Sequence, residues 1–146
     1  MNAKKEKYEN IVIHQPLRPI LGKREVERLR EAIAYTVCDD SPVDCFLGNA
    51  APDGSAMMVG KTLTLRAYSP EGPYPVSIAR FIGRLNFPNR FSLISFLLLH
   101  ELAHRYIPSA RDQDETLCDI LAVSLQSDFK LGTPKLLDEA SEPLLA

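Results

Sequence analysis

The sequence predicts an α+β fold in which a small mixed sheet packs on helices. Apolar residues recur at helical spacing in residues 23–37 and are dense in residues 91–107, which contain no internal Gly or Pro. Residues 57–66 instead alternate between apolar and polar, the pattern of a half-buried strand. Residues 68–75 hold three prolines and one glycine, so we expect a loop there.

The remaining segments are assigned from shorter signals. We expect an extended segment at residues 11–13, a strand at 43–47, turns at 48–55 and a short helix at 76–85. A last helix begins at Asp112 and ends before Gly132-Thr133-Pro134. The leucines of the acidic tail, Leu136 onward, predict at most a weak helix.

Length and composition indicate an ordinary globular domain. The chain has 146 residues, 45% hydrophobic and 25% charged, and we expect one domain over residues 1–146, with 1–15 and 133–146 loosely attached. A net charge of −2 with mixed signs argues against a nucleic-acid partner. The longest apolar run, residues 91–99, is too short to cross a bilayer, and no apolar stretch of a secretory signal follows the polar N-terminus. We therefore expect no membrane partner.

Three widely spaced cysteines, Cys38, Cys45 and Cys118, do not form the pattern of a disulfide-rich secreted protein. They predict a reducing, cytoplasmic setting and small buried side chains, with a thiolate metal ligand as the alternative.

The chemistry-bearing motif is His100-Glu101-Leu102-Ala103-His104, within the predicted helix at 91–107. Histidines four residues apart lie on one helical face and can share a metal ion, for which zinc is the expected identity. Glu101 can then act as a general base on a metal-bound water. The alternative is a pair of partly buried core histidines.

A zinc site of this kind needs a third protein ligand. If residues 108–111 form a tight connection, the two flanking helices are antiparallel, which places Glu115 level with His104 and Asp119 level with His100. We therefore expect Glu115 as the third ligand and Asp119 as a carboxylate that orients His100. Glu115 also has a structural interpretation, as the partner of Asp112 in a helix-capping box. Other ligands that stay open are Asp112, Asp114, His14 and, less favoured, a cysteine.

The two motifs, H-E-x-x-H at 100–104 and E-x-x-x-D at 115–119, resemble those of gluzincin metallopeptidases such as thermolysin, and look most like the compact ImmA/IrrE-type peptidases. The resemblance covers about 35 residues. It implies that His100, His104 and Glu115 bind Zn²⁺, that Glu101 is the catalytic base and that Asp119 supports His100.

We therefore expect an active-site helix pair within residues 91–126 and zinc-dependent hydrolysis of a protein or peptide substrate. The strand at 57–66 would then be a candidate for holding the substrate backbone. Tyr68, Tyr74 and Tyr106 are candidate donors to an oxyanion, although each is better explained as a packed aromatic. Two alternatives are a non-catalytic interaction domain that keeps the metal, and a metal hydrolase acting on another substrate.

Overall fold

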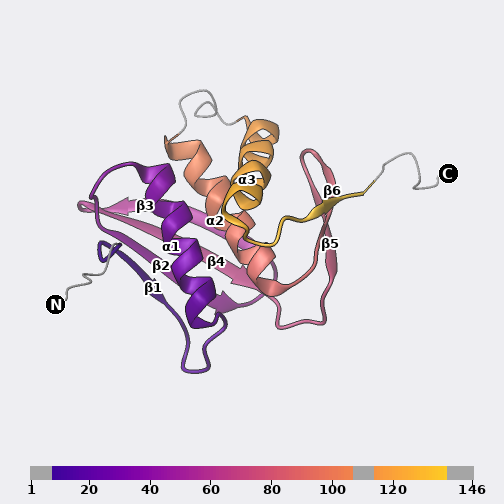
Figure 1. Cartoon of the computed structure of the whole chain (residues 1–146), viewed down its shortest axis with the longest axis horizontal. Helices are drawn as coiled ribbons and strands as arrows, with labels where there is room; N and C mark the ends of the chain where they lie inside the picture. The colour runs from indigo at the N-terminus through magenta and orange to yellow at the C-terminus, as the bar shows by residue number, and fades with distance from the viewer. Residues whose placement is uncertain (1–7, 107–113, 138–146) are drawn as a thin grey trace.

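The main sheet has four strands, of which three run parallel (Figure 1). The computed structural model describes residues 8–106 and 114–137. Strands β1 (Ile11–His14), β2 (Val43–Asn49) and β4 (Thr62–Ser69) are parallel, and β3 (Asp53–Val59) runs antiparallel at the edge beside β4. The sheet and the three helices make the predicted α+β fold.

Helices α1 (Lys23–Val37) and α2 (Arg90–Tyr106) pack on the same face of this sheet (Figure 1). Helix α1 has the predicted bounds and buries Leu29 and Ile33 completely. Its first turn is held where the Gly22 amide donates to the Glu25 carboxylate at 3.0 Å. The strand segments at 11–13 and 43–47 are also confirmed, each with a short extension.

Helix α2 is the central element of the core. Its residues from Phe91 to Leu99 are all buried, because the sheet, α1 and α3 (Glu115–Phe129) surround it. Full burial of each leucine contributes about 1.5–3 kcal/mol. The helix predicted at 91–107 is thus confirmed as far as Tyr106. The buried apolar part of α2 holds its polar C-terminal part, which carries the two histidines, in place.

The segment predicted as one strand at 57–66 is two strands. Gly60, with φ 64°, and Lys61 form a turn that reverses the chain, and Met57 then pairs with Thr64. Met57 therefore shares a sheet face with Thr64 and not with Leu63 and Leu65, as one continuous strand would require. Apolar and polar residues alternate both before and after this two-residue turn. The alternation in the sequence therefore gives no sign that the chain reverses at Gly60.

The helix predicted at 76–85 is also wrong, because these residues form a β-hairpin. Strands β5 (Val76–Arg80) and β6 (Gly83–Phe87) pair antiparallel, and β7 (Lys135–Leu136) adds to β6. Gly83 has φ 132°, a conformation that ends any helix and favours glycine. The weak helix considered for the tail is replaced by β7 at Leu136, while residues 138–146 lie outside the described part.

All three cysteines are free thiols. Cys45 and Cys118 are buried as predicted, but Cys38 is exposed, because it occupies the left-handed position that ends α1. Among the described residues, no helix combines the length and apolar character needed to cross a membrane.

Candidate metal centre

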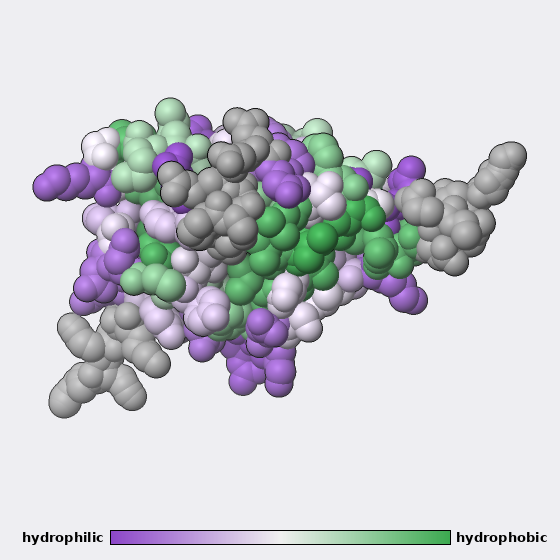
Figure 2. All heavy atoms as spheres, turned by 90° about the horizontal axis from the view of Figure 1, so that it is seen from above, coloured by the Kyte–Doolittle hydropathy of each residue, from purple (hydrophilic) through white to green (hydrophobic). Residues whose placement is uncertain are grey.

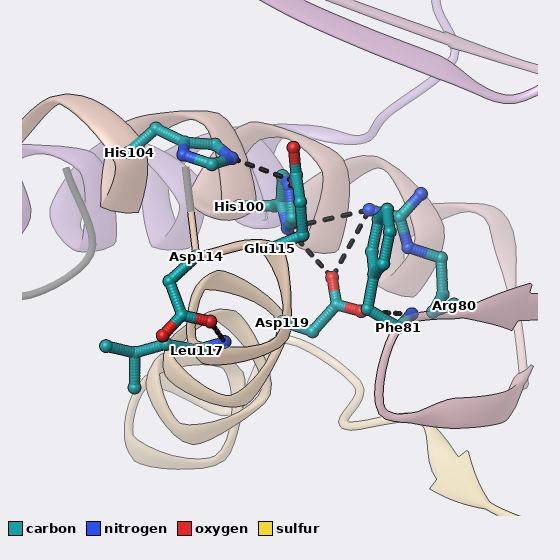
Figure 3. A network of polar contacts seen from close by, with 8 residues as sticks. All are labelled: Arg80, Phe81, His100, His104, Asp114, Glu115, Leu117 and Asp119. Atoms are coloured by element: carbon teal, nitrogen blue, oxygen red, sulfur yellow. Dashed lines mark hydrogen bonds and ion pairs between the residues drawn. The ribbon is translucent and has the colours of Figure 1, made fainter. Parts of the chain in front are cut away.

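Helices α2 and α3 bring the two motifs together. The His100 and His104 Nε2 atoms lie 2.9 and 3.0 Å from the same oxygen of Glu115, Oε1 (Figure 3). The other ring nitrogen of His100, Nδ1, lies 2.8 Å from Asp119 Oδ1. Since His104 meets Glu115 while His100 also meets Asp119, the helices are antiparallel at this point, in the predicted register.

The side chains of His100, His104 and Glu115 fit a metal ion. Each offers one ligand atom, and these three atoms lie within 4.8 Å of one another. Tetrahedral zinc with bonds of about 2.1 Å requires ligand atoms roughly 3.4 Å apart. The Glu115 oxygen lies 2.9 and 3.0 Å from the two ring nitrogens, so it would draw back by about 0.5 Å from each, and the two rings would turn toward a common ion. The group can bind a metal ion, and its donor set, two imidazoles and one carboxylate, suits zinc.

Asp119 fixes which nitrogen of His100 faces the metal position. Its carboxylate is fully buried and lies 2.8 Å from Nδ1, so it can accept the Nδ1 proton while Nε2 faces Glu115 and the metal position. Burial would raise the pKa of Asp119, but the hydrogen bond from His100 and the charge of Arg80 outweigh it and hold the pKa below its ordinary value. Asp119 is therefore a charged acceptor.

Two further residues at this site, Arg80 and Phe81, were not predicted from the sequence. Arg80 Nη2 lies 3.2 Å from Asp119 Oδ1, and the Phe81 amide donates to Oδ2 at 2.8 Å (Figure 3). The Arg80 guanidinium also stands over the Phe96 ring, 5.0 Å from its centroid. No local signal marked these residues, because they reach Asp119 only through the β5–β6 hairpin, and that segment was predicted as a helix.

Glu101 faces a cleft beside the two histidines. The cleft has a volume of about 300 Å³ and is lined by Ala56, Glu101, His104 and Arg105. Burial raises the pKa of Glu101, and the neighbouring histidines offset this only in part. A carboxylate with a raised pKa is a better proton acceptor than an ordinary glutamate.

Edge strand β3 forms the other side of this cleft through Ala56. Gly54 permits its close approach to α2, because a Cβ at Gly54 would lie 3.3 Å from the Leu97 carbonyl oxygen and 3.5 Å from Glu101 Cγ. Of the residues 57–66 that were candidates for holding a substrate backbone, only those in β3 lie at an edge of the sheet. Thr64 is buried within β4, an interior strand.

Glu115 is available for binding because another residue caps its helix. Helix α3 begins at Glu115, and Asp114 is the N-cap, accepting from the Leu117 amide at 3.0 Å. Glu115 is thus the first helical residue, and the interpretation of Glu115 as the third residue of a capping box is wrong. Asp112 itself lies outside the described residues. Burial would raise the pKa of Glu115, but hydrogen bonds from both histidines outweigh it and lower the pKa.

The other candidate ligands lie elsewhere. His14 pairs with Asp44 at 3.1 Å and stacks on Phe46, on the sheet face that the helices leave uncovered. Cys118 is buried against Ala103 and is not in the three-residue group found among the described residues.

The three tyrosines show no oxyanion role. The Tyr74 hydroxyl donates to the Pro70 carbonyl, and Tyr106 packs against the core. Tyr68 lies against Gly48 on the uncovered sheet face. Each of them is therefore a packed aromatic.

A scan of the sequence against protein-family models gives no match, and a search of the curated proteins gives none either. Functional inference therefore rests on the geometry of this centre.

Proposed function

We propose that this chain is a zinc-dependent metallopeptidase. The observation that carries the proposal is the convergence of His100, His104 and Glu115 on one point, with Glu101 next to it in the cleft. Zinc bound there would acidify a water molecule and polarise a carbonyl group. Glu101 would take the proton of the attacking water and pass it to the leaving amine.

The surroundings of the cleft suit a peptide. Among the described residues, β3 is the edge strand of the sheet beside the cleft, and an extended peptide can hydrogen-bond to such an edge as an additional strand. Apolar surface gathers in a band across the face shown in Figure 2, and among the exposed apolar side chains are Phe81, in the β5–β6 turn, and Ile120, on α3. These features support a substrate held by its backbone, with apolar side chains beside the metal.

A defined peptide library tests the proposal. Zinc-loaded protein is incubated with the library, and new peptide termini are identified by mass spectrometry. The matched control is Glu101→Gln, which keeps the size of the side chain and the three proposed ligands but removes the base. We expect cleavage by the wild type and a loss of 100-fold or more in the variant, roughly the contribution of general-base catalysis.

Two outcomes would contradict the proposal. Equal cleavage by the wild type and Glu101→Gln would remove Glu101 from the mechanism. Zinc binding by both proteins without any cleavage would favour the non-catalytic interaction domain instead.

A further inference from the structure

The Asp119 carboxylate is held at three points, by α2 and by the β5–β6 hairpin. His100 Nδ1 on α2 and Arg80 Nη2 at the end of β5 both approach Oδ1, at 2.8 and 3.2 Å, and the Phe81 amide donates to Oδ2. Arg80 Nη2 also lies 3.5 Å from His100 Nδ1. A carboxylate with donors on both oxygens cannot rotate without breaking a hydrogen bond. The position of Oδ1 therefore restrains the direction in which His100 Nδ1 points.

The Arg80 side chain is largely buried beside two aromatic rings. It is only 20% exposed, and its guanidinium lies 5.0 Å from the centroid of the Phe96 ring and 5.7 Å from that of the Phe81 ring. Within the described part of the chain, Arg80 Nε is one of two buried side-chain polar atoms without a hydrogen-bond partner. A buried donor left unpaired is unfavourable. The position of the guanidinium is thus set by Asp119 and the aromatic rings, and its Nε–H is left without a hydrogen-bond acceptor.

We propose that Arg80 is a positioning residue for the metal centre, which acts through Asp119 to hold the His100 ring with Nε2 facing the metal. This inference rests on the metal site of the proposed function. The planar fork of arginine lets the side chain pair with the carboxylate while it stacks on Phe96, which the point charge of lysine does less well. The β5–β6 hairpin is thereby part of the site.

A purely structural role gives a different expectation. If Arg80 only fastened the hairpin to α3, its removal would lower the stability of the metal-free protein but would leave the metal affinity of the folded protein unchanged. Metal affinity measured on folded protein therefore separates the two roles.

The first experiment measures zinc affinity by competition with a chromogenic chelator. Arg80→Met keeps the apolar stem over Phe96 and removes the charge, and we expect a 10- to 100-fold loss of affinity. Arg80→Lys should recover part of it, and it replaces the methionine variant if that protein does not fold. Arg84→Met, on an exposed arginine of the same hairpin, is the matched control and should bind as the wild type does. Wild-type affinity in both Arg80 variants would overturn the proposal.

A double substitution tests whether the effect passes through Asp119. In an Asp119→Asn background, Arg80→Met should reduce zinc affinity little further, because the acceptor that it orients has already been altered. If the two losses multiply instead, Arg80 acts by another route and the proposal is wrong.

A readout without metal separates this inference from the proposed function. Crystal structures of the metal-free wild type and of Arg80→Met report the orientation of the His100 ring. We expect the wild-type ring to keep its Nδ1 contact with Asp119 and the ring in Arg80→Met to adopt more than one orientation. The same result in a protein that binds no zinc would refute the proposed function but support the positioning role. An unchanged ring orientation in Arg80→Met would overturn that role.

Discussion

Removal of the Asp119 side chain should damage both the fold and the metal centre. Asp119→Ala eliminates three polar contacts, those with His100, Arg80 and the Phe81 amide, and leaves the Arg80 charge without its buried partner. Breaking a buried ion pair on one side costs about 3–5 kcal/mol, and because the Arg80 side chain is 20% exposed we expect the lower end, about 3 kcal/mol. For a domain of this size, that lowers the Tm by roughly 10 °C.

The zinc affinity of Asp119→Ala should fall by about 10- to 100-fold, since the ligand His100 stays but loses its orienting partner. Calorimetry of the metal-free protein gives the Tm, and chelator competition gives the affinity. Asp114→Ala is the control, because it removes only the α3 N-cap and should cost about 1 kcal/mol without a measurable change in zinc affinity. Loss of zinc binding in Asp114→Ala together with wild-type binding in Asp119→Ala would refute the assigned roles.

Three further predictions concern single side chains. Glu115→Ala should abolish tight zinc binding, as measured by chelator competition, because it removes a direct ligand; wild-type affinity would exclude Glu115. Metal-free Glu101→Gln should be more stable than the wild type at pH 7. Burial raises the pKa of Glu101, so its ionised form destabilises the fold at high pH, and the gain in Tm should vanish as the pH falls below the ordinary glutamate pKa of about 4.3. A gain independent of pH would contradict this. Thiol labelling of the native protein should modify the exposed Cys38 rapidly and spare Cys45, whose pKa burial raises to about 12; equal labelling rates would refute the burial of Cys45.

The parts of the fold that follow local periodicity could be predicted from the sequence. Residues 23–37 and 91–107 show their helical character within single segments, and the former has the predicted bounds. The facing of His104 with Glu115 and of His100 with Asp119 was also predicted, although α3 begins at Glu115 and not at Asp112, and the connection expected at 108–111 lies outside the described residues. Distances along two regular helices were enough for this part.

The hairpins could not be predicted in this way, and they carry the rest of the site. The turn at Gly60 lies between two alternating strands whose pattern continues across it. Residues 76–85 are too short and mixed in character to distinguish a helix from a hairpin by periodicity. Because Arg80 reaches Asp119 only when that hairpin forms, its role depends on tertiary structure. The N-cap of α3 was also predicted incorrectly, at Asp112 and not at Asp114. Both are aspartates, which are equally good N-cap residues, so the sequence does not distinguish them.

Anomalous diffraction at the zinc edge, from crystals grown with zinc, tests the metal centre most directly. We expect one peak per chain at about 2.0–2.2 Å from His100 Nε2, His104 Nε2 and a Glu115 oxygen, with a fourth coordination position taken by solvent. A folded protein without a peak between these side chains, or with a fourth protein ligand closing the site, would contradict the assignment of a catalytic zinc centre.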